Sequence, residues 1–277
     1  MIYKASLISL VVLFLSSDLL FGNNGNHHNG ARSAAMGNAS VTLSDVWSMH
    51  HNQAGLAHLD NPVAGVFYEN RFLLPELSIG GASFAMPTNS GTFGVGFTTF
   101  GHRLHRQGKF GVSYGRKLGE VISTGIRINY ENTRLGNDYG DNNTMTIEGG
   151  ILAKVSDELT FGFHLYNPTR AKLAEYNDER LPTVMRVGMS YKFSDQLFVV
   201  VEAEKDVDMD AIAKFGLEYH PVDKFYLRAG IASNPMFSTF GFGLKLDHLT
   251  IDFASGVHSV LGYTPHISLI YNFNKKQ

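Results

Sequence analysis

The side chains that could do chemistry near the N-terminus are a group of histidines. The group consists of His27, His28, His50, His51 and His58. Imidazole is a common ligand for zinc and other transition metals, but a site needs several ligands that converge on one point. The first two lie in an Asn/Gly stretch, and adjacent residues such as the third and fourth point in different directions on any regular element. We therefore expect no metal site, and we interpret these histidines as polar residues of an N-terminal arm.

Other candidate sites are equally incomplete. The stretch DYGDNN at 138–143 offers oxygen ligands but lacks the bidentate Glu of an EF-hand loop, so we interpret it as a solvated loop tip. The spaced glycines of GTFGVGF at 91–97 and GFGLKL at 241–246 are not followed by a helix, as a phosphate-binding loop requires. The G-x-S-x-G pattern GVSYG at 111–115 lies within a predicted strand and is not followed by a helix, as a nucleophile elbow requires. We predict a protein that is not an enzyme and has no cofactor.

The composition indicates a β protein. Of 277 residues, 17% are charged, below the roughly 25% of soluble domains, while 29 are Gly and 12% are aromatic. The net charge of -2 gives no basic surface for nucleic acid. The absence of Cys excludes disulfide scaffolds and thiolate metal sites.

Residues 1–22 are predicted to be a signal peptide. Lys4 supplies a positive n-region, and residues 5–15 form an apolar h-region of signal-peptide length. The alternative is a membrane-anchor helix, but Asp18 interrupts the run, and about 20 apolar residues are needed to span a bilayer. Export from the cytoplasm is therefore the favoured interpretation.

Residues 23–61 are predicted to form an N-terminal arm and lumen plug. Small residues dominate from 30 to 59, which permits close backbone approach inside a narrow space. A flexible arm is the alternative, but Met36, Val41, Val46, Trp47 and Leu56 all need burial.

This block resembles the N-terminal signature of FadL-like outer-membrane barrels, especially the PorV/PorQ-type group. The family pattern is roughly G-A-R-[SA]-x-[AG]-M-G-[GN]-A-x-V, then Asp, then N-P-A-G-L-A. The resemblance implies a plug motif of Gly30, Ala31, Arg32, Met36, Gly37, Asp45, Asn52, Ala54, Gly55 and Leu56, with further matches at Ser33, Ala35, Ala39, Val41 and Ala57. Gln53 stands where the family usually has Pro, so we expect a less rigid turn there.

Residues 62–277 are predicted to form a transmembrane antiparallel β-barrel of about 14 strands. Segments of about ten residues alternate apolar and polar side chains; Leu197, Val199 and Val201 oppose Glu202 and Glu204. The predicted strands are 62–70, 77–86, 91–101, 108–116, 119–131, 143–154, 158–166, 182–193, 196–205, 211–220, 223–232, 236–246, 248–257 and 264–273.

A soluble β-sandwich is the alternative, with the apolar face as its core. We favour the barrel because short connections alternate with longer ones, as periplasmic turns alternate with extracellular loops, which places both termini in the periplasm. Aromatic residues also gather near strand ends, as in membrane-interface girdles: Tyr68, Phe100, Tyr130, Tyr166, Tyr191, Phe193, Tyr219, Phe225, Tyr271 and Phe273.

The inward faces carry both signs of charge beside many glycines. The principal predicted lumen charges are Arg127, Glu148, Arg186, Glu202, Glu218, Arg228 and Asp252. Mixed charges can pair across the lumen, and glycines leave room for the N-terminal block. No ring of a single sign is present, so we expect a plugged lumen rather than an ion-selective channel.

Two functions follow from the resemblance. We favour a non-enzymatic accessory or scaffold subunit of an outer-membrane protein export complex, as the PorV likeness implies, in contact with lipids and secretion-machinery proteins. Its candidate partner loop is 167–180, with Arg170, Leu173 and Tyr176. The alternative is a FadL-like transporter of small hydrophobic molecules. The inward charges argue against a long apolar tunnel, but Phe198, Val200 and Leu152 fall on the inward face and could line a local pocket for a hydrophobic ligand.

Overall fold

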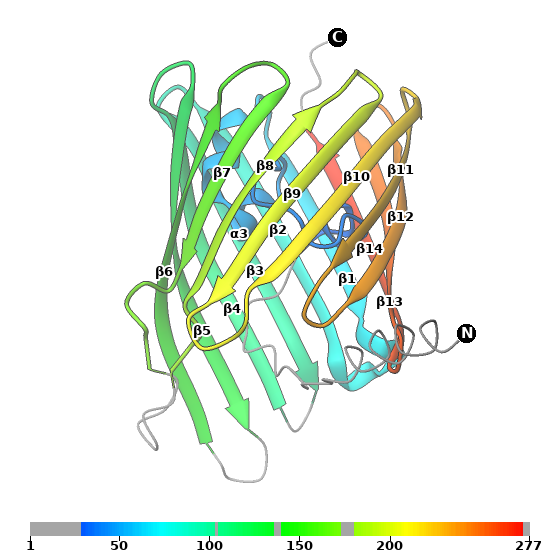
Figure 1. Cartoon of the computed structure of the whole chain (residues 1–277). Coiled ribbons are helices and arrows are strands. Elements are labelled where there is room, and N and C mark those ends of the chain that lie inside the picture. Colours follow the sequence, from blue (N-terminus) through cyan, green and yellow to red (C-terminus); the bar gives the residue numbers. More distant parts are fainter. Residues whose placement is uncertain (1–28, 103–104, 136–139, 173–179, 274–277) are drawn as a thin grey trace, which may run out of the picture.

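The protein is a closed barrel of fourteen antiparallel strands in the computed structural model, which describes residues 29–102, 105–135, 140–172 and 180–273 (Figure 1). The strands are β1 Val63–Asn70, β2 Ser78–Thr88, β3 Gly91–His102, β4 His105–Lys117, β5 Ile122–Leu135, β6 Gly140–Lys154, β7 Leu159–Tyr166, β8 Val184–Lys192, β9 Leu197–Asp206, β10 Ile212–Val222, β11 Phe225–Ala232, β12 Phe237–Lys245, β13 Leu249–His258 and β14 Gly262–Asn272. The predicted all-β barrel and its strand number are confirmed. The alternative of a soluble sandwich is wrong, because the strands form one sheet closed on itself.

The sheet closes without an edge. Each strand pairs with its neighbours along the chain, and β1 pairs with β14 through a register that joins Val63 to Asn272 and Glu69 to His266. Closure removes the unpaired N–H and C=O groups that an open sheet would expose. The predicted signal peptide, residues 1–22, lies outside the described residues.

Apolar side chains point outward, and polar side chains point inward. On β10, Phe215 and Tyr219 are exposed while Lys214 and Glu218 are buried. The same alternation runs round the barrel, so its outer surface is apolar and its interior carries the charge. Among the described residues, no helix has the length and hydrophobicity needed to cross a membrane.

The two ends of the barrel differ in their connections. At the short-turn end, strands are joined by residues 89–90, 118–121, 155–158, 193–196, 223–224 and 246–248. The opposite end, here called the long-loop end, carries residues 71–77, which include η2 Arg71–Leu73 and η3 Pro75–Leu77, and the long connection 167–183.

Two predicted long loops are instead continued strands. The ladder between β3 and β4 runs to the pair His102–His105, and the ladder between β5 and β6 runs to the pair Leu135–Gly140. The expected loops at 102–107 and 131–143 are therefore mostly strand, and β5 and β6 reach furthest at the lower end of Figure 1. The polar side chains of these extensions led to the prediction of loops. A strand ladder, however, requires only that the two backbones pair. Polar side chains are compatible with strands that extend beyond the membrane into solvent.

The connection 167–183 turns partly into the barrel mouth. Asn167 is fully buried, and its side-chain amide donates to the carbonyl oxygens of Leu181 at 3.0 Å and Pro182 at 3.1 Å. The side chain of Leu181 is 5% exposed. This part of the connection therefore covers the interior instead of extending outward.

The candidate partner residues of this connection are only partly described. Arg170 is exposed, and its Nη2 lies 3.6 Å from Oδ2 of Asp208. Leu173 and Tyr176 lie outside the described residues. The partner loop therefore stays a prediction.

Residues 29–59, called the lumen segment below, lie inside the barrel. The segment contains the short helices α2 Ala31–Ala35 and α3 Ser48–His51 and the 3₁₀ helix η1 Gln53–His58, and Figure 1 draws it in blue within the ring of strands. Most of its residues are buried. Strands β1 to β14 thus surround another part of the same chain.

A charge on the outer face tests the orientation of the strands. Val187 lies in the middle of β8 with its side chain exposed, and Val207 lies beyond β9 at the long-loop end. We expect Val187→Arg to lower the free energy of unfolding by about 2–4 kcal/mol in lipid vesicles, while Val207→Arg costs about 0–1 kcal/mol, because the cost of a charge falls toward the interface. Urea titration of the folded fraction on an unboiled gel measures both. Equal effects would contradict a lipid-facing Val187.

Candidate functional site

Inward-facing glycines of the wall touch the backbone of the lumen segment. A Cβ on Gly230 of β11 would lie 2.1 Å from the amide nitrogen of Gly37. A Cβ on Gly125 of β5 would lie 2.3 Å from the carbonyl carbon of Gln53. Such contacts are closer than any real Cβ allows, so any larger residue at these positions would displace the segment or the strand. The missing side chains at Gly230 and Gly125 therefore allow the backbone of the segment to lie directly against the wall.

The lumen segment follows the inner circumference of the barrel. Helix α2 packs against β12, β13 and β14. The amide of Gly37 donates to Oγ1 of Thr239 on β12 at 2.8 Å, and the carbonyl oxygen of Val41 lies 2.6 Å from where a Cβ of Gly162 on β7 would be. Helix α3 then reaches β3, and η1 contacts β4, β5 and β6. Successive parts of one segment therefore contact nearly every strand.

One ion-pair network joins the segment to strands β10, β11 and β13. Arg32 donates through Nη2 to Oε1 of Glu218 at 2.8 Å and approaches Oδ2 of Asp45 at 3.4 Å. Arg228 binds the other oxygen of Glu218 at 2.6 Å and Oδ1 of Asp252 at 2.7 Å. Two arginines and three carboxylates thus share charge in a buried place, where an unpaired ion would be very costly.

Glu202 anchors the segment through its backbone. Its Oε2 accepts hydrogen bonds from the amides of Ser40 at 2.7 Å and Val41 at 2.8 Å. Its Oε1 accepts from Nζ of Lys214 at 2.9 Å. Hydrogen bonds to an ionised acceptor are stronger than neutral ones. One carboxylate on β9 therefore fixes the middle of the segment.

A second buried cluster surrounds Glu148 on β6. Its Oε2 lies 3.0 Å from Nε2 of His164, and its Oε1 lies 3.6 Å from Nζ of Lys109 and 3.9 Å from Nε of Arg127. Nη1 of Arg127 also donates to the carbonyl oxygen of Met49 at 2.8 Å. This cluster ties α3 to the wall opposite the network of Glu218.

The structure places all seven predicted lumen charges inside the barrel, and each one forms an ion pair. Arg186, the remaining member, donates from Nε to Oε2 of Glu204 at 2.8 Å, and Glu204 also accepts from Lys214 at 2.6 Å. The seven side chains are buried: Arg127, Glu148, Arg186, Glu202, Glu218, Arg228 and Asp252.

The ten residues of the predicted plug motif all lie in the lumen segment. Arg32 and Asp45 keep 24% and 15% of their side chains exposed, and the other eight residues are buried. Asn52 donates to the carbonyl oxygens of Val41 at 2.8 Å and Ile151 at 3.1 Å, so it joins two parts of the segment to β6. Gln53, which replaces the expected Pro, is buried and donates to a carbonyl oxygen of α3 at 3.0 Å.

His50 and His51 are buried in the segment. Nε2 of His50 lies 2.8 Å from Oγ of Ser83, and its Nδ1 lies 2.8 Å from Nη1 of Arg127. Burial, and then the nearby guanidinium, hold the pKa of His50 well below its ordinary value. Among the described residues, no three His, Asp or Glu side chains are grouped as metal ligands; His27 and His28 lie outside this part.

Sequence reasoning missed some interior residues. His164 was not singled out, and Tyr166 and Phe100 were assigned to the outer aromatic girdle. Tyr166 is fully buried, and its hydroxyl donates to Oε1 of Glu131 at 2.7 Å. The signal was available, because Tyr166 shares the parity of inward His164 along β7.

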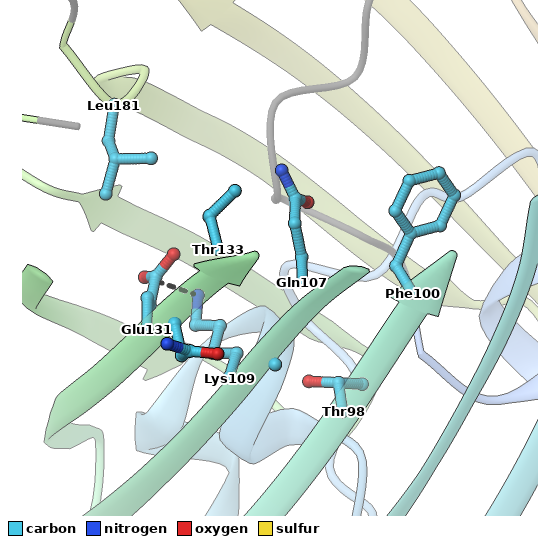
Figure 2. Close-up of a pocket in the computed structure, with 9 residues that line it drawn as sticks. Thr98, Phe100, Gln107, Lys109, Glu131, Thr133 and Leu181 are labelled. Carbon is cyan, nitrogen blue, oxygen red and sulfur yellow. Dashed lines mark ion pairs between the residues drawn. The ribbon is translucent and has the colours of Figure 1, made fainter. Parts of the chain in front are cut away.

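A small pocket lies in the lumen near the long-loop end (Figure 2), and its free volume of about 20 Å³ is that of about one water molecule. Phe100, Lys109, Glu131 and Leu181 are part of its lining, and Nζ of Lys109 lies 3.7 Å from Oε1 of Glu131. Phe100 also packs against a buried apolar cluster that includes Trp47 of the segment. The pocket thus has an apolar side next to the lumen segment and a polar side toward β4 and β5.

The chain is similar to known proteins in structure but matches none of the sequences with which it was compared. No protein-family model and no curated protein sequence matches the chain. The solved structure of the CymD monoaromatic hydrocarbon channel matches with a TM-score of 0.72 and 13% identity, over 90% of this chain and 98% of that one. A Pseudomonas aeruginosa FadL homologue matches at 0.67 and 14%, over 89% and 98%. The Ralstonia pickettii toluene transporter TbuX matches at 0.67 and 13%, over 90% and 100%.

These likenesses show that the chain has the FadL-like barrel fold. They agree with the broader part of the resemblance drawn from the N-terminal motif. The narrower PorV/PorQ-type assignment stays a prediction.

Deleting the lumen segment tests whether it blocks passage. We expect a protein without residues 30–57 to show larger single-channel conductance in planar bilayers than the full chain, because the segment occupies the space that the inward glycines leave. Conductance equal to that of the full chain would remove the idea of a plug.

A point substitution tests the anchor without removing the segment. We expect Glu202→Gln to lower the free energy of unfolding by about 1–3 kcal/mol and to increase brief channel openings, because Lys214 loses one of its two carboxylates and two amides lose a charged acceptor. Glu120→Gln, at an exposed turn, is the matched control. If both variants behave alike in the planar-bilayer recordings, the anchoring role of Glu202 is wrong.

Proposed function

We propose that this protein is an outer-membrane channel that carries small hydrophobic molecules, with its short-turn end in the periplasm. The observation that carries the proposal is the likeness of nearly the whole chain to channels for monoaromatic hydrocarbons and toluene. The apolar outer face supports residence in a membrane. The proposal reverses the order of preference drawn from the sequence, in which transport was the alternative.

The lumen pocket marks where a ligand would bind, and its lining has to move apart to admit one, because its free space holds only about one water molecule. Phe100 and Leu181 give it apolar surface, and the cluster of Trp47, Phe67 and Ile79 lies beside it. Small-molecule sites are typically concave and mostly apolar, with a few polar groups that fix orientation. Lys109 and Glu131 form an ion pair with each other. An apolar ligand can therefore bind beside them without leaving either charge unpaired.

Passage further along the lumen requires movement of the lumen segment. Its contacts with Gly230, Gly125 and Glu202 leave it pressed against the wall. Ligand binding against Phe100 would act on the segment through the apolar cluster on which Phe100 packs, in which Trp47 of the segment lies edge-on to Phe67 of β1 at 5.4 Å between centroids. The pocket is therefore the first site, and displacement of the segment is the step that follows.

A second candidate function is the accessory role in a protein export complex, with a PorV-like set of envelope partners. The observation that favours it is the filled and charge-paired lumen, which suits a rigid scaffold as well as a gated channel. In that role, residues 167–180 would contact other outer-membrane proteins. Gentle detergent extraction followed by mass spectrometry separates the two: stable co-purification of envelope proteins favours the scaffold, and a lone barrel with bound small molecules favours transport.

Trp47 gives a direct test of ligand binding, because it is the only tryptophan of the chain. We expect bromobenzene to quench its fluorescence in a saturable way, and toluene to reverse the quenching by competition. Thr133→Phe, which fills the pocket from β5, should weaken the quenching. The Trp47→Phe protein gives the background. Quenching that is linear in bromobenzene and unaffected by toluene would contradict the proposed site.

A further inference from the structure

The outer face of strands β3, β4 and β5 carries a hollow near the long-loop end, on the lipid side of the wall. It encloses about 710 Å³, including open solvent. Strand register arranges its lining in three rows across the strands: Phe97–Phe110–Tyr130, then Thr99–Gly108–Asn132, then Arg106–Arg134. The hollow therefore changes from aromatic to polar to cationic along the direction that leads to the long-loop end.

The middle row forms the floor of the hollow because Gly108 has no side chain. A Cβ at this position would meet only the ring of Phe97, at 3.9 Å. Asn132 donates from Nδ2 to Oδ1 of Asn143 at 2.7 Å, and the hydroxyl of Tyr130 donates to the same oxygen at 2.8 Å. The space above Gly108 is therefore open, and polar groups border it.

The charge of the hollow comes from Arg106 and Arg134. Nε of Arg106 donates weakly to Oγ1 of Thr99 at 3.4 Å, and Arg106 forms no ion pair with a carboxylate in the described part of the chain. Arg134 pairs with Asp141 at 3.0 Å, with 62% and 45% of the two side chains exposed. The hollow therefore has two guanidinium groups and one carboxylate, that of Asp141. Because the Arg134–Asp141 pair is exposed, Arg134 keeps N–H donors that are accessible to a ligand.

On the other side of the aromatic row, the hollow leads onto an aliphatic surface. The next row across the strands is Val95, Val112 and Ile128, each 42–49% exposed. Aromatic rows of this kind mark the membrane interface in barrels, with the hydrocarbon on one side and headgroups on the other. A ligand that fills the hollow would therefore have an apolar part, a polar part and an anionic part in that order.

We propose that this hollow binds a membrane lipid with a phosphate-bearing headgroup, from the leaflet at the long-loop end. The acyl chains lie along the aliphatic and aromatic rows, the polar linker lies over Gly108, and a phosphate accepts hydrogen bonds from Arg106 and Arg134. Guanidinium groups bind phosphate through paired N–H donors, which suits two arginines on adjacent strands. The inference rests on the proposed membrane location of the barrel but not on transport.

Native mass spectrometry of the full, folded protein in non-ionic detergent tests this site, with diphosphoryl lipid A as the probe. We expect one lipid bound with preference, and the Arg106→Gln/Arg134→Gln protein should bind it about tenfold more weakly, because two charge-assisted contacts are lost. Gly108→Leu should also weaken binding by filling the floor. Arg116→Gln is the matched control, since Arg116 is exposed on the same face of β4 at the short-turn end.

Three outcomes would overturn the assignment. They are no preferential lipid on the unaltered protein, equal affinity of the double variant and the unaltered protein, and arginine-dependent binding of inorganic phosphate alone at similar affinity. Quenching of Trp47 by bromobenzene should be unchanged in the double variant. A failure of lipid binding with intact quenching therefore counts against this site only, and the reverse counts against the transport function only.

Discussion

The interior of this barrel is wider than its inward side chains fill, so another piece of the same chain occupies the remaining space. Eight strands enclose a space that side chains can fill, and sixteen to eighteen leave a water-filled channel. Fourteen strands lie between these cases, and glycines such as Gly125 and Gly230 widen the space further. The lumen segment takes up this room by packing backbone against backbone. The segment runs along the inner wall because the inward glycines of several strands let its backbone approach closely.

The paired charges are the second consequence of a filled interior. Once the segment excludes water, each ion must find a partner, and the wall supplies them in compact groups around Glu218, Glu202 and Glu148. Each group also includes a bond to the segment, through Arg32, through two backbone amides, or through the carbonyl of Met49 by way of Arg127. The charges therefore add directional bonds to the apolar and backbone contacts that position the segment. Any passage through the lumen has to break some of these bonds.

Much of the fold could be predicted from the sequence, because alternation with period two and turn residues are local signals. The strand β9 was expected at 196–205 and is found at Leu197–Asp206. The signal failed where backbone pairing continues through polar residues, as at Leu135–Gly140, and where an aromatic near a strand end points inward, as Tyr166 does. The inward turn of Leu181 depends on the buried amide of Asn167, a long-range contact that no local pattern encodes. The proposed function also reverses the order drawn from the sequence, because the motif covers only the segment while the likeness to hydrocarbon channels covers nearly the whole chain.

The account depends most on the contact between wall glycines and the lumen segment, and a matched pair of substitutions isolates it. Gly230 and Gly256 both face inward, but a Cβ on the first meets Gly37 at 2.1 Å, while a Cβ on the second meets nothing closer than 3.9 Å. Hydrogen exchange of the folded barrel, followed by mass spectrometry of peptides from 30–57, compares them. The account predicts protected segment amides in the unaltered and Gly256→Ala proteins, and much faster exchange of the segment in Gly230→Ala while the strands remain protected. Equal protection in both variants, or rapid exchange of the segment in the unaltered protein, would contradict it.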